Sequence, residues 1–437
     1  MKGFNINMGG FVVTPGVAGA SAAGTAPVST PRRRLQACCA LPRRSRAHQN
    51  AGLVLRMALA AAVSIVLASC AGLPRTAFSE QEQSIAQIPG MPDVRFTADA
   101  PAGEISRALG KDTIRAAAEK NGRFEMLALS GGAWDGAYGA GILNGWTRSG
   151  KRPKFAVVTG VSAGSLIAPF AFLGPEYDAE LKDAFTSGVI EPVGDGTDSL
   201  LSVIGEAGLR RDRLRDLVSR YVDQRFLQAV AAEHKQGRRL LIVTTNLDAQ
   251  RAVVWNMGII ASRSDAQALE LFRDVLTASC SVPGMFEPTR ITVTANGRQF
   301  EELHVDGGVT TNVFMLPDAI LANGLNDRPK LRGSMYVIMN TTLAPEFEVQ
   351  EAKVSTLLGR SLSTLLKAHS KTTVLASFEF ARSSGMDFNL THIDKELPKD
   401  LKPSFNTDYM RAVYIMGYNR ATAGNFWEKT ISFPRRR

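Results

Sequence analysis

The chain has 437 residues, of which 45% are hydrophobic and 21% are charged, so it can hold one large α/β domain or two smaller ones. Its formal net charge is +10, but residues 1–70 hold eight basic residues and no acidic residue, which leaves only +2 for the rest. A nearly neutral body excludes nucleic-acid binding based on charge, and the basic excess belongs to an N-terminal leader.

The leader has the features of a secretory signal. Residues 1–50 show almost no periodicity, which indicates a disordered stretch or an over-extended gene start. Arg56 then precedes an apolar run, residues 57–67, that is too short to span a bilayer comfortably. The stretch Leu67-Ala68-Ser69-Cys70 resembles the bacterial lipobox, and this resemblance implies cleavage before Cys70 and attachment of lipid to it. A plain signal peptide, or a membrane anchor that contains a cysteine, is the alternative.

We therefore expect residues 1–70 to be a leader and lipoprotein signal segment. The protein would then lie in the bacterial cell envelope, as an outer-membrane lipoprotein that faces the periplasm and touches the membrane surface through its lipid anchor. In the body, Cys280 is the only cysteine after Cys70, so a disulfide framework is excluded there. No residues have the spacing of metal ligands, and the sequence predicts no metal and no cofactor.

A polar tether is expected between the leader and the globular body. Residues 71–122 are mixed and polar, contain four prolines and end in a predicted short helix. The body begins with a strand predicted at residues 124–129, followed by the glycine-rich loop SGGAWDGAYGAG at residues 130–141 and a helix from Ile142. Consecutive N–H groups with little side-chain obstruction suit an oxyanion hole or a phosphate site, but no complete nucleotide-binding motif is present.

A second strand-to-helix turn carries a candidate nucleophile. Residues 155–158 form an apolar run rich in valine, then Gly160-Val161-Ser162-Ala163-Gly164 precedes an apolar stretch long enough for a helix. Strand, G-x-S-x-G and helix together predict a nucleophile elbow, in which Gly160 and Gly164 remove side chains that would collide with the neighbouring elements. Ser162 would stand at a helix N-terminus, where free N–H groups favour developing negative charge.

The remaining pattern alternates strands and helices. Asp306 follows one of the predicted strands and precedes Gly307 and Gly308, so its carboxylate can project from the strand end toward the elbow. The predicted elements are a charged amphipathic helix within residues 195–221, strands at 239–245, 252–255, 291–294, 302–305 and 334–339, a helix at 269–278, and helix, loop and helix from residue 354.

These motifs together resemble the patatin-like phospholipases. The glycine loop, the elbow GVSAG, the stretch ASCSVPGMF and the HVDGG turn occur in that family's order and spacing. The resemblance implies a three-layer α/β fold with a mainly parallel central sheet and a Ser–Asp dyad. It covers a catalytic domain at residues 123–340, and residues 341–437 are expected to be a helical extension packed on that domain.

The resemblance also implies the chemistry. Ser162 matches the family nucleophile, Asp306 matches its acid partner, and Gly131, Gly132 and Ala133 match the oxyanion loop. The chain is then a serine lipid acyl hydrolase of the phospholipase A or esterase type, whose partner is a lipid or another acyl ester. The loop departs from the family pattern because Ala133 replaces a third glycine and Asp135 replaces a basic residue, which puts the rate and the head-group preference in question.

Two other functions stay open. An α/β-hydrolase with a Ser-Asp-His triad needs a histidine after the acid, and neither His369 nor His392 lies in a convincing strand-end loop. His304 precedes the acid, which is the wrong order, and is predicted to be a packed or exposed strand residue. The second alternative is a non-catalytic envelope lipoprotein that binds lipid, which only the Ala133 and Asp135 departures support.

Overall fold

The computed structural model describes residues 75–109, 123–191, 200–318, 320, 332–394 and 404–431, without the side chains of residues 200–210 and 355. The chain divides into two compact units, Met1–Leu73 and Pro74–Arg437, and every described residue belongs to the second. The predicted leader, its signal segment and Cys70 lie outside the described residues.

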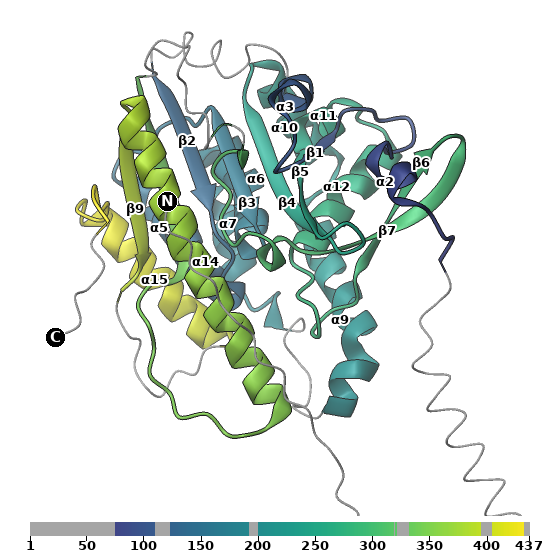
Figure 1. The fold of residues 1–437 in the computed structure, drawn as a ribbon. Helices are drawn as coiled ribbons and strands as arrows, with labels where there is room; N and C mark the ends of the chain where they lie inside the picture. The colour runs from purple at the N-terminus through teal and green to yellow at the C-terminus, as the bar shows by residue number, and fades with distance from the viewer. Residues whose placement is uncertain are drawn as a thin grey trace, which may run out of the picture. The chain divides into compact units, whose positions relative to one another are not determined.

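A mixed sheet of nine strands forms the centre of the described part of the chain (Figure 1). The pairs β2–β3, β2–β8, β3–β4 and β8–β9 are parallel, whereas β5, β1 and the β6–β7 hairpin join the β4 side in antiparallel pairs. The predicted α/β class with a mainly parallel central sheet is confirmed. In sheet order the strands are β1 (Arg95–Thr97), β5 (Arg251–Asn256), β4 (Arg239–Asn246), β3 (Val157–Val161), β2 (Phe124–Leu129), β8 (Gly333–Thr342) and β9 (Asp387–Ile393), and the hairpin is β6 (Thr289–Ala295) with β7 (Arg298–Asp306).

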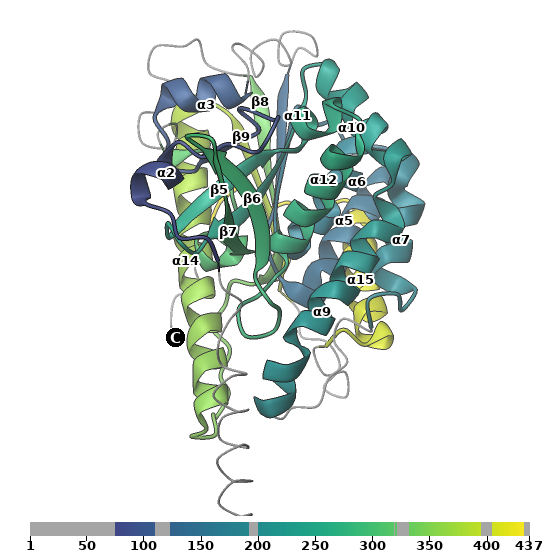
Figure 2. The same ribbon diagram turned by 90° about the vertical axis from the view of Figure 1, so that its right-hand side faces the viewer.

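Helices cover both faces of this sheet (Figure 2). Two separate sets of buried apolar side chains fill the space between the sheet and the two helical layers. One face carries α5 (Gly136–Arg148), α6 (Ala163–Leu173), α7 (Asp178–Thr186), α9 (Leu200–Tyr221), α10 (Gln224–Lys235), α11 (Met257–Ser262), α12 (Ala266–Ser279) and α15 (Thr407–Thr422), and the other carries α3 (Ala102–Leu109) and α14 (Val354–Ser384), with the short α2 (Glu80–Ser84) beside it.

The glycines of α5 serve packing rather than the loop that precedes them. The loop is shorter than predicted, because η1 (Ala133–Asp135) follows Gly132 directly and α5 begins at Gly136. A Cβ on Gly141 would lie 2.1 Å from the Tyr414 carbonyl oxygen, and one on Gly145 would lie 2.4 Å from that of Tyr418. Side chains are therefore excluded there, and α5 and α15 pack with their backbones in contact.

The tether prediction is wrong for the described residues 75–109. β1 pairs with β5 at the edge of the sheet, and Met91, Val94 and Phe96 are buried. Val94 and Phe96 alternate as a half-buried strand requires, but β1 is only three residues long and follows two prolines. A strand this short is recognised through its partner, which lies about 160 residues later in the chain.

The C-terminal region adds a strand as well as helices. α14 and α15 agree with the predicted helices, but β9 joins the central sheet beside β8 in parallel. Nearly all of its side chains are buried, as expected for a strand covered on both faces. Among the helices that the structure describes, none is both long and apolar enough to cross a membrane.

Candidate active site

Ser162 stands alone between β3 and α6, in a strained backbone conformation. β3 ends at Val161, α6 begins at Ala163, and Ser162 has φ +52° and ψ −127°. A positive φ is uncommon for a residue with a side chain and persists only where the surroundings enforce it. A Cβ on Gly160 would lie 2.5 Å from the Gly164 carbonyl oxygen, and one on Gly164 would lie 2.4 Å from that of Leu129. Both glycines are thus required by close packing, as the sequence predicts.

The last residue of α12 and the residues that follow it, 279–281, include the groups that hold the Ser162 backbone in place. The Ser279 hydroxyl accepts a hydrogen bond from the Ser162 N–H at 3.1 Å and donates one to the Val243 carbonyl at 2.7 Å. The buried Cys280 thiol donates to the Ser162 carbonyl, with Sγ and O 3.1 Å apart. Ser279 and Cys280 therefore satisfy both backbone groups of the strained residue, a role that their position in the sequence did not indicate.

We expect Ser279→Ala to lower turnover more than it changes KM. The substitution leaves the Ser162 N–H without its acceptor, which costs about 1–3 kcal/mol of stability and loosens the elbow. The expected loss in kcat is about tenfold, measured with a soluble ester.

Ser281→Ala is the matched control for this variant. The Ser281 hydroxyl donates to the Thr277 carbonyl at 2.8 Å, inside its own segment, and does not touch the elbow. Equal kcat in the two variants would show that Ser279 has only a structural role.

Asp306 lies at the end of β7, where the same segment holds it. β7 pairs with β4 so that Asp306 stands opposite Thr244, and the Asp306 N–H donates to the Ser281 carbonyl at 2.9 Å. Its Oδ1 accepts the Gly308 N–H at 2.7 Å, while its Oδ2 is buried and makes no hydrogen bond of ordinary geometry. A Cβ on Gly307 would lie 2.5 Å from the Val243 carbonyl oxygen, so this turn also approaches β4 closely. Residues 279–281 thus contact both Ser162 and Asp306.

Burial gives Asp306 a proton affinity suited to a base. Only 4% of Asp306 and 8% of Ser162 are exposed. Burial raises the pKa of Asp306 to about 7, against the opposing effects of the Ser162 hydroxyl and the Gly308 N–H. The Ser162 side chain therefore lies near enough to the carboxylate to act on its pKa, and the structure brings together the two residues that the sequence singles out.

The glycine loop lies against Ser162. A Cβ on Gly131 would be 3.1 Å from the Ser162 Cβ and 2.4 Å from the Asn312 Oδ1. However, the Gly131 N–H donates to the Asn312 carbonyl at 2.9 Å, so it is not available to an oxyanion. Of the three predicted donors, Gly131 is thus engaged within the protein in this structure. The N–H groups of Gly132 and Ala133 make no hydrogen bond with any described residue.

Ala133 is the strained position of this loop. Its φ is +48°, a value that costs an alanine roughly 1 kcal/mol and a glycine nothing. A glycine at this position would carry no strain, so the Ala133 backbone is held in this conformation by its surroundings. At Gly132 a side chain is excluded by lack of space, because a Cβ would lie 2.1 Å from the Asn340 carbonyl oxygen.

We expect Ala133→Gly to raise the free energy of unfolding or leave it unchanged. Relief of the positive φ gains about 1 kcal/mol, part of which the larger entropy of glycine in the unfolded chain offsets. Turnover of a soluble ester should stay equal or rise, because the N–H is retained. Thermal unfolding and steady-state kinetics measure the two effects, and a loss of stability above about 1 kcal/mol would contradict the strain argument.

Two asparagines hold the loop in place, and no sequence motif points to either. Asn340, on β8, donates its side-chain amide to the Ser130 carbonyl at 2.7 Å and its backbone N–H to the Ser130 hydroxyl at 2.8 Å. Asn312 accepts from Gly131 through its carbonyl and donates its side-chain amide to the Ser370 hydroxyl at 2.9 Å. The loop is therefore held by residues about 180 to 210 positions later in the chain.

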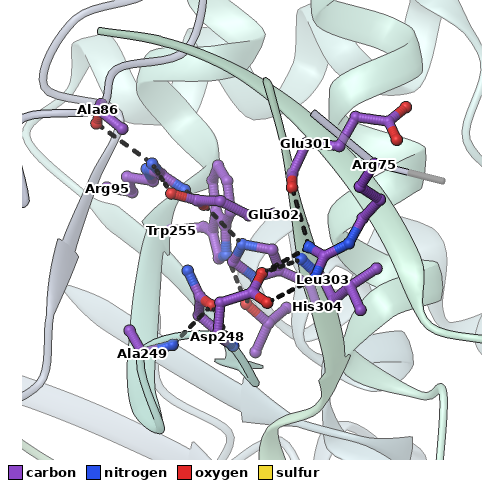
Figure 3. Close-up of polar contacts among 12 residues, drawn as sticks. Arg75, Ala86, Arg95, Asp248, Ala249, Trp255, Glu301, Glu302, Leu303 and His304 are labelled. Atoms are coloured by element: carbon purple, nitrogen blue, oxygen red, sulfur yellow. Dashed lines mark hydrogen bonds and ion pairs between the residues drawn. The ribbon is translucent and has the colours of Figure 1, made fainter. Parts of the chain in front are cut away.

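Both ring nitrogens of His304 make hydrogen bonds within a buried polar network (Figure 3). Trp255 donates its indole N–H to the Thr244 hydroxyl at 2.8 Å, and we assign the hydroxyl proton to the 2.9 Å contact with His304 Nδ1. His304 Nε2 then donates to Glu302 at 3.0 Å, and Arg95 pairs with the same carboxylate, with a 3.0 Å contact. This assignment of hydrogens satisfies every member with a neutral histidine.

The electrostatics of this network agree with the assignment. Burial alone raises the pKa of Glu302, but His304 and Arg95 outweigh it and bring the pKa to about 2. Burial lowers the pKa of His304, although Glu302 opposes this. The pair is therefore a carboxylate beside a neutral imidazole, and both nitrogens of that imidazole are in use.

The other two candidate histidines lie elsewhere. His369 is exposed on α14, and His392, on β9, contacts the Ile393 carbonyl at 3.0 Å and Glu428 at 3.2 Å. Neither contacts Ser162 or Asp306. In the part of the chain that the structure describes, no group of three or more His, Cys, Asp or Glu side chains is placed to hold a metal ion.

Asp135 is held by the C-terminal helix. The Tyr409 hydroxyl, on α15, donates to its carboxylate at 2.6 Å. Burial raises the pKa of Asp135 to about 7, against the effect of that hydrogen bond. The residue that replaces a basic position in the loop is thus a structural partner of α15.

A family model matches part of the chain. The model of the family described as patatin-like phospholipase matches residues 127–318, which include the glycine loop, Ser162 and Asp306. Among solved structures, the crystal structure of VipD from Legionella pneumophila matches with 13% identity and a TM-score of 0.30. The match covers 69% of this chain and 66% of that one. None of the curated proteins compared matches the sequence.

Proposed function

We propose that the protein is a serine hydrolase that cleaves acyl esters of lipids with a dyad of Ser162 and Asp306. The patatin-like phospholipase domain at residues 127–318 supports the reaction class. One observation carries the proposal: the buried Asp306 Oδ2, which lacks an ordinary hydrogen bond, belongs to a carboxylate beside Ser162 whose pKa is about 7. An unsatisfied buried carboxylate oxygen is costly, which favours a role in proton transfer.

In the proposed acylation step, Asp306 Oδ2 takes the Ser162 hydroxyl proton as Oγ attacks the ester carbonyl carbon. The negative charge that forms on the carbonyl oxygen is stabilised by N–H donors at Gly132, Ala133 and Ala163. Ala163 begins α6, so its N–H has no acceptor within the helix, and the helix dipole adds to the effect. The ester C–O bond then breaks, and the leaving alkoxide takes the proton from Asp306.

In the proposed deacylation step, water attacks the acyl-Ser162 ester while Asp306 accepts a proton from it. The same N–H groups stabilise the second oxyanion. Collapse breaks the bond between Ser162 Oγ and the acyl carbon, Ser162 regains its proton from Asp306, and a free fatty acid leaves. The dyad is therefore restored without a histidine.

The triad alternative loses support from the geometry of His304. Both ring nitrogens are hydrogen-bonded within a network that includes neither Ser162 nor Asp306. The non-catalytic alternative is weakened by the strain at Ser162, because a purely structural turn would relieve it with glycine.

A fluorophosphonate probe tests the proposed function directly. The probe reacts with an activated serine, so we expect labelling at Ser162, together with release of fatty acid from phospholipids or short p-nitrophenyl esters. Product identification would give the acyl position cleaved. Absence of labelling in a folded protein with no hydrolysis would favour the non-catalytic alternative.

We also propose that residues 1–69 are removed and that Cys70 then begins the chain and carries lipid, as a bacterial outer-membrane lipoprotein facing the periplasm requires. The support is the sequence alone, through the short apolar run and the Leu-Ala-Ser-Cys stretch. We expect mass spectrometry of the native N-terminal peptide to show acylated Cys70 as the first residue. An unmodified Cys70, or a peptide that runs through it, would refute the lipobox.

A further inference from the structure

Large apolar side chains gather on the surface of α14 and of the segment before it. They are Phe347 (95% exposed), Val349 (83%), Val354 (74%), Leu358 (66%), Leu365 (67%) and Leu357 (48%). Single exposed apolar residues are common on soluble proteins, but a group this dense requires an explanation. We call Val354, Leu357, Leu358 and Leu365 the apolar stripe.

The apolar stripe lies on the side of α14 that faces away from the sheet. At 3.6 residues per turn, Val354, Leu358 and Leu365 fall within about 40° of one another around the helix axis. The buried residues Ser370, Val374 and Ala381 fall on the opposite side. A helix packed on a domain normally presents polar residues outward, so α14 is apolar where water is expected.

The stripe also lies beyond the body of the domain. The first turns of α14 run past the end of the sheet (Figure 2). Of the described side chains between Val354 and Leu365, none is buried. This stretch rises about 18 Å, so it projects from the surface as an unpacked arm.

The arm ends next to the candidate active site. Leu366, one residue after the stripe, would lie 3.6 Å from a Cβ on Gly308, next to Asp306. One turn later Ser370 binds Asn312, whose carbonyl accepts the Gly131 N–H. The side of α14 that carries Leu366 and Ser370 therefore contacts the residues around Asp306 and the glycine loop, directly after the turns that carry the stripe.

The charges near the stripe fit a phospholipid surface. The ionisable residues of α14 from Val354 to Phe378 are Arg360, Lys367, His369 and Lys371, whereas Glu346, Glu348 and Glu351 lie in the segment before it. Arg360 pairs with Glu348 at 3.5 Å, and such partly exposed pairs contribute little, so this cation can turn to phosphates. Lys367 is held by Glu346 and by the Thr342 hydroxyl and the Ala344 carbonyl. An apolar face flanked by cations is typical of helices that lie in a membrane interface.

We propose that the apolar stripe, with Phe347 and Val349, inserts into the polar–apolar boundary of a phospholipid layer and holds the active site against it. This rests on the proposed function, since a lipid acyl hydrolase must reach substrates that are themselves part of such a layer. The contact is separate from the proposed lipid on Cys70. The stripe contact would place the active site directly at the lipid surface, whereas a lipid on Cys70 would only limit how far the protein can move from the membrane.

Flotation with vesicles of phosphatidylcholine and phosphatidylglycerol tests the surface. The full chain carries Cys70→Ser, so that no lipid is attached, and Ser162→Ala, so that turnover does not alter the vesicles. Leu358→Ser with Leu365→Ser should weaken partition by about tenfold or more, because two inserted leucines are lost. Leu375→Ser is the matched control: it alters an exposed leucine on the packed half of α14 and should change partition less than about twofold.

A second readout separates this inference from the proposed function. With Ser162 intact, the stripe variant should keep kcat/KM for a soluble p-nitrophenyl ester and lose hydrolysis of vesicle phospholipid. Partition that depends on the stripe in a protein without ester hydrolysis would retain the surface and refute the function. Equal partition of the stripe variant and the Leu375→Ser control overturns the inference. So does a concentration-dependent dimer that the stripe substitutions abolish without a change in partition, because a second copy then covers the stripe.

Discussion

Ser162→Ala is expected to abolish ester hydrolysis, with a loss of at least about a thousandfold in kcat. The change removes one hydroxyl and no other group, since the backbone bonds to Ser279 and Cys280 are retained. Alanine keeps the strain of the positive φ, so the free energy of unfolding should stay close to that of the wild type. Steady-state kinetics with a soluble ester and thermal unfolding are the two measurements.

Two further variants make this result decisive. Ser162→Gly should be equally inactive but up to about 1 kcal/mol more stable, because glycine adopts the positive φ without strain. Ser165→Ala removes a buried hydroxyl of α6 near Cys280 and should retain most activity. Substantial hydrolysis by folded Ser162→Ala would mean that another residue is the nucleophile.

Asp306→Asn is expected to lower kcat by a similar factor while the fold is retained. The amide oxygen can still accept the Gly308 N–H, but the side chain can no longer take a proton from Ser162. The wild-type kcat/KM should rise with pH and level off above about 7, because the raised pKa of Asp306 sets the fraction of active base.

The raised pKa of Asp306 also predicts that stability falls over the pH range in which kcat/KM rises. Folding raises the pKa of Asp306 from an unfolded value of about 3.9, so between about pH 4 and 7 the folded chain binds more protons. The free energy of unfolding then falls as pH rises through this range. Asp306→Asn removes this fall, so the variant should gain stability relative to the wild type at pH 8 and little at pH 4. Equal stability of the two proteins at both pH values would contradict the raised pKa.

Histidine variants complete the test of the dyad. His369→Ala and His392→Ala should keep most activity, since neither side chain contacts the site. His304→Ala should lose stability, because it leaves the Thr244 and Glu302 groups of a buried network without their partner. Activity measured where this variant is still folded should remain. An inactive, folded histidine variant would favour a triad.

The elements that the sequence predicts well are those with a strong local signal. The valine-rich run before Gly160 and the apolar stretch after Gly164 determine β3, the turn and α6 within about twenty residues. β1 and β9 are missed because each depends on a partner strand. β1 has three residues and pairs with β5. β9 lies where the sequence predicts a helical extension, although its buried run suits a parallel strand.

The active site also combines residues that short local motifs predict with residues that only the folded chain brings together. Ser162 and Asp306 are found from short motifs, but the groups that hold them come from distant positions. The carbonyl of Asn312, about 180 residues later in the chain, accepts the Gly131 N–H. This hydrogen bond can be seen only in the folded structure. Ser279 lies within a motif that the sequence marks, yet its hydrogen bond to the elbow requires that α12 end beside β4. The strain at Ala133 depends on a dihedral angle that no local pattern specifies.

The position of β2 sets the smallest part of this chain that can fold independently. β2 lies between β3 and β8, and α5 packs backbone to backbone on α15, so elements after residue 318 complete the interior of the region that carries Ser162. A chain truncated to residues 127–318 would expose one edge of β2 and the glycine face of α5. An unpaired central strand is a template for intermolecular pairing, so such a fragment should aggregate instead of remaining monomeric. A fragment that folds should therefore contain the whole sheet and α15. It should extend from the residues before β1 through α15, beyond the family match at residues 127–318.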